Sequence, residues 1–334
     1  MKDETEGPWL HALSVVRPAL VLAPTTFLAG LRDGFARNGV SNAISRHDNG
    51  PIYDWVMSLV GLQGISDRVA FAFTAQHGLA TWEGVREGLR TRPACSHLQG
   101  HWQFRGCGYQ KSARTCAEPH LLPSCPLPAL PLRKGTLNQA AYSLALFIRD
   151  ACHGDLVGWI DRRLADADPG FGMTDRAAVM KDAVLSPLSE VHGVGPKVWS
   201  MLLADLLLGA DPSRERWVAT GAAMIAIDSL VHAFLHRTGI LRRLECEHPY
   251  GPACYGPAGC ASVIGGLARR IDAREFNAAH PVNFSRFVQA AIWAFCAEGG
   301  YGICNGNKID DRQRCDQIYC PAYSTCDRIV FRVK

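Results

Sequence analysis

Long apolar runs are absent from this sequence of 334 residues, and none approaches the ~20 residues that cross a membrane. The opening residues, MKDETEG, also lack the positive start and the apolar core of a secretory signal. These two absences predict a cytoplasmic protein with no membrane partner. The sequence also has little excess of one charge over the other, and its net charge of +4 permits nucleic-acid binding without requiring it.

Alternating strand patterns are also scarce, and no internal repeat is visible. Apolar residues instead recur at helical spacing, as in IYDWVMSLVGL, where Ile52, Val56, Leu59 and Val60 share one side. The predicted fold class is therefore all-α. The clearest helices are expected at residues 52–62, 67–79, 81–89, 137–152, 180–191, 197–210, 228–239 and 284–300.

Cysteine, by contrast, is abundant, with thirteen residues. In a reducing compartment, clustered cysteines are more often metal ligands than disulfides. One quartet, near the C-terminus, fits a zinc ion or a [4Fe–4S] cluster, and a looser quartet is a second candidate metal or cluster site. Three more cysteines, with His248 as a possible fourth ligand, are predicted only to lie in an ordered loop, and two isolated ones to be small buried side chains. In that order they are Cys304, Cys315, Cys320 and Cys326; Cys95, Cys107, Cys116 and Cys125; Cys246, Cys254 and Cys260; Cys152 and Cys296.

Residues 91–134 and 244–260 have little periodicity and are expected to be loop-like insertions into the helical scaffold. The first interleaves Trp102, Phe104 and Tyr109 with cations, a composition that suits stacking on an unpaired base. The alternative is a surface excursion whose aromatic side chains cover its own small core. Its cations are Arg92, Arg105, Lys111, Arg114, Arg133 and Lys134, against the single acid Glu118.

The stretch LSEVHGVGPKVW, residues 188–199, places two glycines and a proline between two apolar helices. Gly193 suits a left-handed helix end, and Pro196 suits the first turn of the next helix. The prediction is a tight helix-hairpin-helix, in which Gly195 leaves the backbone bare and free N–H groups can hold a phosphate oxygen. The alternative is a tight turn that packs two helices and binds nothing.

Two side chains near this hairpin are candidates for catalysis. Lys197 falls in the first helical turn, where a cation is disfavoured, and partial burial would further favour the neutral, nucleophilic amine. The alternative is a solvated or phosphate-binding lysine. Asp228 precedes the helix SLVHAFLHR and suits an N-cap, which is compatible with stabilising a cation or relaying a proton.

Together, LSEVHGVGPKVW and AIDSLVHAFLHRTGI resemble the helix-hairpin-helix DNA glycosylases of the endonuclease III superfamily. Upstream, VGLQGISDRVAFAF resembles the family's early helix, with Gln63 where the family fills the gap left by a flipped base; the alternative for Gln63 is a solvated polar residue. Two features depart from the family. Leu230 replaces its histidine, and Lys197 and Asp228 are 31 positions apart, more than the family's usual interval.

This resemblance implies a two-lobed glycosylase fold. One lobe spans residues 45–225 and includes the hairpin, 188–208, and the Cys-rich basic insertion, 91–134. The other joins residues 1–44 to 226–334 and carries a Cys-rich loop, 304–326, for which the resemblance favours [4Fe–4S] over zinc. That loop would hold its cations Lys308, Arg312, Arg314 and Arg328 against DNA.

The resemblance also implies base excision by a monomer acting on double-stranded DNA that contains a damaged or modified base. Lys197 would displace the base, with AP-lyase activity following from a Schiff base, and Asp228 would stabilise the cationic sugar. Gln63, Gly193, Gly195, Lys308 and Arg312 would contact DNA. The alternatives are a monofunctional glycosylase and a non-catalytic DNA-binding protein, and the target base is left open.

Overall fold

The computed structural model describes residues 6–65, 67–91, 95–306 and 308–331. Within these ranges the chain is all-helical, and no strand is formed beyond an isolated bridge between Gln110 and Thr115. The predicted all-α class is therefore confirmed. Arg92, one of the cations assigned to the insertion, and the first five residues of the acidic start lie outside the described residues.

The chain divides into two compact units, which we call the hairpin unit, Leu31–Trp217, and the terminal unit, Met1–Gly30 with Val218–Lys334. The lobes expected from the sequence meet at residues 44 and 225. The structure instead assigns residues 31–44 to the hairpin unit and residues 218–225 to the terminal unit. Two helices run across these boundaries, α2 (Phe27–Arg37) and α11 (Glu215–Ala223).

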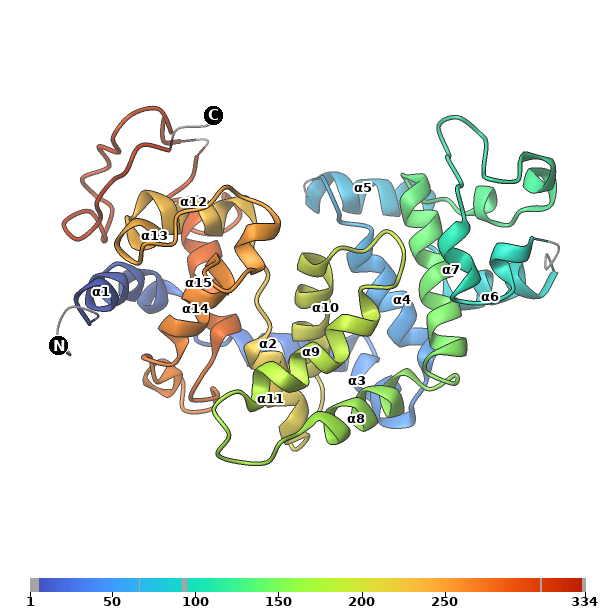
Figure 1. Cartoon of the computed structure of the whole chain (residues 1–334), viewed down its shortest axis with the longest axis horizontal. Helices are drawn as coiled ribbons and strands as arrows, with labels where there is room; N and C mark the ends of the chain where they lie inside the picture. Colours follow the sequence, from blue (N-terminus) through green and yellow to red (C-terminus); the bar gives the residue numbers. More distant parts are fainter. Residues whose placement is uncertain (1–5, 66, 92–94, 307, 332–334) are drawn as a thin grey trace. The chain divides into compact units, whose positions relative to one another are not determined.

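The hairpin unit is built around α7, in which every residue from Leu137 to Ile148 is buried. The side chains of α4, α7, α8, α9 and α10 meet in an apolar core that includes Val56, Leu144 and Trp199. Figure 1 shows α4, α7 and α10 as neighbours in this unit. Its helices are α3 (Val40–Arg46), α4 (Asn49–Val60), α5 (Asp67–His77), α6 (Trp82–Thr91), α7 (Gly135–Asp150), α8 (Leu156–Ala167), α9 (Arg176–Leu188) and α10 (Pro196–Gly209).

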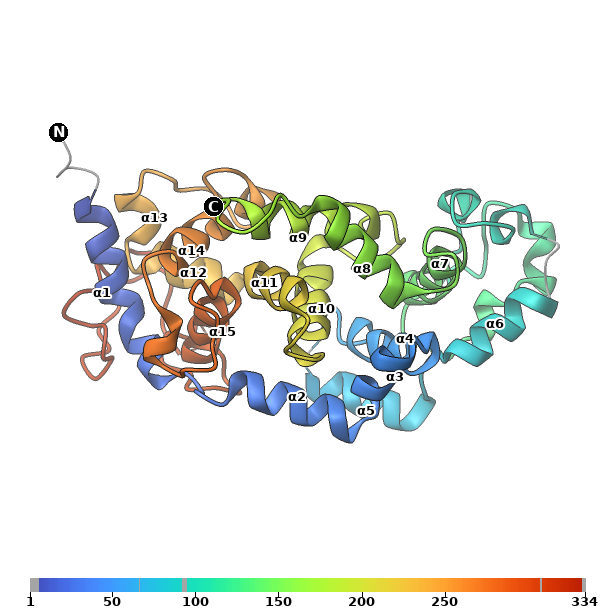
Figure 2. The ribbon, with the colours of Figure 1, turned by 90° about the horizontal axis from the view of Figure 1, so that it is seen from below.

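The terminal unit is built around α15, which contacts α1, α12 and α14. Both views draw α12, α14 and α15 together (Figures 1 and 2). Phe234 of α12 packs edge-on against Phe295 of α15, with 5.9 Å between the ring centres. Its helices are α1 (Glu6–Leu22), α12 (Ser229–Arg237), α13 (Ile240–Arg243), α14 (Cys260–Ala268) and α15 (Ser285–Cys296).

Among the residues that the structure describes, the two segments that lack periodicity in the sequence form no α-helix beyond residue 91 in the first and none before Cys260 in the second. Residues 95–134 contain short 3-10 turns at Ser96–Leu98, Gln103–Gly106, Pro119–Ser124 and Leu127–Ala129. The second segment contains one such turn, Pro252–Tyr255, and a further one, Ala273–Glu275, lies elsewhere in the terminal unit. Both segments are thus loop-like, as predicted.

Candidate functional site

The hairpin between α9 and α10 has the backbone that its glycines require. Gly193 adopts φ +79°, and a Cβ at this position would lie 2.6 Å from the carbonyl oxygen of Thr136. Only glycine meets both conditions without strain. The next residue but one, Gly195, is the N-cap of α10 in extended conformation, and a Cβ there would meet no atom within 4 Å. Pro196 is the first residue of α10, as predicted.

The hairpin is fastened to α7, the central helix of its unit. Besides the close approach of Gly193 to Thr136, the backbone N–H of His192 donates to Ser143 Oγ at 2.9 Å. In the first turn of α10, Pro196 has no N–H and the N–H of Val198 donates to the carbonyl oxygen of Gly195 at 3.0 Å, which leaves the N–H of Lys197 to face the exposed turn. This arrangement is chemically suited to hold an oxyanion.

An open pocket of about 560 Å³ lies beside the hairpin and is lined by residues 189–195, by Ser143 and by three residues of the Cys-rich insertion. Those three are His101, Phe104 and Arg105, and the Arg105 guanidinium pairs with the Glu190 carboxylate. Burial lowers the pKa of both His101 and His192, so that near pH 7 these imidazoles are neutral. The insertion and the hairpin together line this pocket, and the pair of Arg105 with Glu190 joins them.

Lys197 is exposed in the first turn of α10. The partial burial considered from the sequence is absent, because no packed element covers this side chain in the described structure. What remains of the electrostatic argument is its position at the positive end of α10. The amine is accessible to a macromolecular substrate.

Asp228 is the N-cap of α12, and its carboxylate accepts from the backbone N–H of Val231 at 2.9 Å. The predicted capping role is therefore confirmed. Burial raises the pKa of two tyrosines in the loop before α14, Tyr250 and Tyr255, and that of Tyr255 rises to about 12. The nearby Asp228 carboxylate raises both pKa values further. The backbone N–H of Ile227 donates to Tyr255 Oη at 2.9 Å, which holds this phenol beside the carboxylate.

Gln63 lies in the turn after α4. Its backbone carbonyl accepts from Arg133 Nη2 at 2.6 Å, while its side-chain Nε2 is buried and has no hydrogen-bond partner. The residue as a whole is half-buried, and both the gap-filling role and the solvated alternative stay predictions.

The cysteine quartet near the C-terminus lines one small apolar cavity with Phe234, Phe295 and Ile309. The thiols of Cys304, Cys315, Cys320 and Cys326 interact electrostatically with one another, which places them close together. The buried Arg237 donates from Nη1 to Cys304 Sγ at 3.0 Å and also pairs with Asp311. A hydrogen bond from the Cys296 thiol, with help from Arg237, lowers the pKa of Cys304 to about 7.

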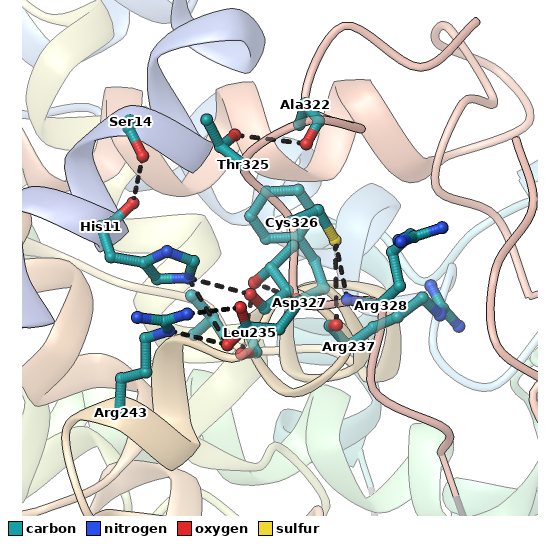
Figure 3. Close-up of polar contacts among 12 residues, drawn as sticks. His11, Ser14, Leu235, Arg237, Arg243, Ala322, Thr325, Cys326, Asp327 and Arg328 are labelled. Atoms are coloured by element: carbon teal, nitrogen blue, oxygen red, sulfur yellow. Dashed lines mark hydrogen bonds and ion pairs between the residues drawn. The ribbon is translucent and has the colours of Figure 1, made fainter. Parts of the chain in front are cut away.

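The segment after this quartet is fastened to the end of α12 and to α1 and α13 (Figure 3). The Asp327 carboxylate accepts two hydrogen bonds from Arg243, each 2.7 Å, and His11 reaches the same group. The Cys326 thiol lies 3.8 Å from the carbonyl oxygen of Arg237, and the N–H of Ile329 donates to that carbonyl at 2.8 Å. The last carbonyls of α12 are thus capped by the chain that carries the cysteines.

The cations assigned to this loop differ in their availability. Lys308, Arg312 and Arg314 are exposed. Arg312, however, forms an ion pair with Asp310 at 3.0 Å, which offsets its charge. Arg328 donates to Tyr323 Oη at 2.6 Å and stacks over that ring, so it is used within the loop.

The second quartet also clusters, since the thiols of Cys95, Cys107, Cys116 and Cys125 interact electrostatically. Its aromatic neighbours divide between the two interpretations. Phe104 is buried and Tyr109 is only 6 % exposed, so both cover the core of the insertion rather than a nucleotide base. Trp102 alone is open to solvent, at 58 % exposed.

A third group of soft ligands comprises His232, His248, Cys254 and Cys260, whose ligand atoms all lie within 4.8 Å of one another. It is the only group of three or more such atoms at this spacing within the described residues. The sequence drew attention to the two cysteines and to His248, but His232 was missed because it falls within an apolar helix. The spacing His-x15-His-x5-Cys-x5-Cys was the sequence signal that could have indicated this group.

Comparison with protein-family models, curated proteins and solved structures found no match to this chain. Of the helices that the structure describes, none is by itself long and apolar enough to cross a membrane, although α1 and α2 meet both criteria together as a bent pair.

Proposed function

We propose that the chain is a helix-hairpin-helix DNA glycosylase with associated AP-lyase activity. The observation that carries this proposal is the hairpin: a left-handed Gly193, an uncovered Gly195 and an exposed Lys197 lie within five residues at the start of one helix. Such a turn offers backbone N–H groups to a DNA phosphate without reading its sequence. The amine next to it would then lie beside the nucleotide attached to that phosphate.

In the proposed reaction the damaged or modified nucleotide is flipped out of the duplex. Lys197 Nζ forms a bond to C1′ of the sugar while the bond from C1′ to the base breaks, and the base takes up a proton as it leaves. Opening of the sugar gives a Schiff base between C1′ and the lysine. Loss of a proton from C2′ then expels the 3′ phosphate, which breaks the strand.

Asp228 is assigned to the same reaction. Its carboxylate would stabilise the positive charge that develops on the sugar and assist the proton transfers. The neighbouring Tyr255, held by the backbone N–H of Ile227, is neutral at ordinary pH like any tyrosine, so it can donate a hydrogen bond and adds no competing negative charge. A neutral phenol and a carboxylate side by side suit a site that must bind a cation.

The residues of the C-terminal quartet fit an iron–sulfur cluster better than a single zinc ion. Four cysteines can hold either one zinc ion or a [4Fe–4S] cluster, and their spacing along the chain does not choose between the two. The apolar cavity that they line and the buried Arg237 beside Cys304 suit an anionic cluster. We propose that these four cysteines hold [4Fe–4S], which would fold the loop that presents Lys308 to DNA.

The chemistry can be tested by reduction with borohydride, which converts a Schiff base to a permanent bond. Wild-type protein should become covalently attached to DNA that contains an abasic site, and Lys197→Ala should abolish the adduct. Lys181→Ala, on the preceding helix α9, is the matched control and should be trapped like the wild type.

Asp228→Asn should still cap α12 and bind DNA but should release the base ~100-fold more slowly, or worse.

The outcomes separate three kinds of protein. Base release without trapping, retained in Lys197→Ala, would replace the proposed lyase with a monofunctional glycosylase in which Lys197 only contacts phosphate. DNA binding with neither base release nor abasic-site cleavage, over a panel of modified duplexes, would leave a non-catalytic DNA-binding protein. The same panel would identify the excised base.

A further inference from the structure

Four side chains of the terminal unit that play no part in the proposed glycosylase chemistry converge on one point. His232 comes from α12, His248 and Cys254 from the following loop, and Cys260 from the first turn of α14. The Sγ atom of Cys260 lies 3.3 Å from His232 Nδ1 and 3.3 Å from His248 Nε2. The Sγ atom of Cys254 lies 3.5 Å from the same His232 Nδ1.

These separations match the edges of a tetrahedron around a zinc ion. With a Zn–S bond of about 2.3 Å and a Zn–N bond of about 2.0–2.1 Å, a sulfur and a nitrogen ligand are about 3.5 Å apart. The three observed sulfur–nitrogen distances are 3.3, 3.3 and 3.5 Å. An iron–sulfur cluster spreads its cysteine sulfurs over several metal ions, so this tighter group suits one ion.

The surroundings of the four groups are those of a structural metal site. His248 Nδ1 lies 2.7 Å from the carbonyl oxygen of Cys246, so that Nδ1 carries the hydrogen and the lone pair of Nε2 faces the cluster. His232, Cys254 and Cys260 are buried, with at most 2 % of each residue exposed. Four protein ligands and little exposure leave no open position for a substrate, which distinguishes a structural zinc from a catalytic one.

We infer that His232, His248, Cys254 and Cys260 bind one zinc ion that fixes the loop between α13 and α14. This loop is short of apolar residues and rich in glycine and proline, so little else in its sequence, CEHPYGPACYGPAG, would order it. It carries Tyr250 and Tyr255 to Asp228. The ion therefore organises the surroundings of the carboxylate from a distance, without touching a substrate.

The decisive measurement uses the purified full-length wild-type chain. Elemental analysis should find tightly bound zinc, and X-ray absorption at the zinc edge should show nitrogen as well as sulfur ligands. Both cysteine quartets offer sulfur alone, so nitrogen at zinc identifies the mixed site. Absence of zinc, or zinc surrounded by sulfur only, would overturn the inference whether or not the chain proves to be a glycosylase.

Variants then assign the ligands. Cys254→Ser and His248→Asn should each lower the zinc content by one ion per chain. Cys246→Ser is the matched control from the same loop: its thiol donates to the carbonyl oxygen of Leu241 at 3.4 Å and is not among the four converging groups, so its zinc content should not change. Folded Cys254→Ser protein with the full zinc content would remove Cys254 from the site and contradict the inference.

Discussion

Gly193 and Gly195 stand one residue apart in the hairpin, yet the structure constrains them in opposite ways. The positive φ and the nearby Thr136 carbonyl oxygen make a side chain at Gly193 costly, whereas Gly195 has an ordinary φ of −81° and open space around it. The first glycine is therefore required by the fold. The second is not required by the fold, and the open space beside it leaves room for a ligand at the start of α10.

This difference predicts distinct effects of substitution. Gly193→Ala should lower the free energy of unfolding by about 1–2 kcal/mol or more, since a left-handed residue with a Cβ already costs that much without a clash. Gly195→Val should change stability little but weaken binding to many duplexes alike, because it obstructs a phosphate contact. Chemical denaturation and DNA titration at several salt concentrations measure the two effects.

Equal destabilisation by the two substitutions would contradict this assignment of structural roles. Unchanged DNA affinity in folded Gly195→Val protein would remove the hairpin from the DNA interface and weaken the proposed function.

At the scale of elements, a partly buried group of charges joins α8, α9 and α11. Asp168, which follows α8, accepts hydrogen bonds from Arg176 at 2.6 and 2.8 Å and from Arg216 at 2.8 Å. Arg176 also donates to Glu215 at 2.6 and 2.7 Å. The hydrogen bonds from Arg176 and then from Arg216 hold the pKa of Asp168 well below its ordinary value. These contacts fix the segment that lengthens the interval between Lys197 and Asp228.

The lowered pKa of Asp168 predicts a stability that depends on pH. Because the folded state favours the ionised carboxylate, its contribution is complete above the unfolded pKa of about 3.9 and is lost progressively below it. Asp168→Asn should therefore destabilise the chain at pH 7 and have a smaller effect at pH 3. Urea midpoints at both pH values test this, with the exposed Asp166→Asn on α8 as control. A difference between wild type and Asp168→Asn that did not shrink at pH 3 would show that the ionised form of Asp168 is not what stabilises the fold.

At the scale of the whole molecule, the proposed chemistry is divided between the two units. The hairpin and Lys197 belong to the hairpin unit, whereas Asp228, the C-terminal quartet and the mixed histidine–cysteine group belong to the terminal unit. The terminal unit holds two of the three candidate metal sites, whereas the quartet Cys95, Cys107, Cys116 and Cys125 lies in the hairpin unit, so we expect the folding of the terminal unit to depend most on metals. Metal binding would couple directly to its folding, because most of the ligands come from segments with little regular structure and only His232 and Cys260 lie on α-helices.

We expect iron and zinc to depend on different sets of ligands. Protein purified without oxygen should be brown and contain about four irons at the C-terminal quartet, and Cys326→Ser should lose the colour while any folded fraction keeps its zinc. Absorption spectra and elemental analysis provide the readout. Colourless wild-type protein that contains zinc but no iron would refute the iron–sulfur assignment without affecting the mixed zinc site.

Several features of the fold follow from local sequence. The periodicity of residues 52–62 and 137–152 predicted α4 and α7, the Thr81 hydroxyl caps α6 by accepting from the N–H of Gly84 at 3.2 Å, and Asp228 caps α12. Helices, caps and hairpin turns depend on residues a few positions apart, so their signals are present in the sequence itself. The burial of Cys152 and Cys296 followed in the same way from their apolar helical surroundings.

Other features were decided by tertiary structure alone. Whether Tyr109 faces solvent or the core, whether Arg312 is free or paired, and where the amide of Gln63 points depend on neighbours that the pattern of one segment does not specify. The mixed site is the clearest case. The sequence supplied its two cysteines and His248, but the packing of α12 and α14 against α15 brought His232 to them. Sequence determines which ligands exist; only the packed helices determine which of them can meet around one ion.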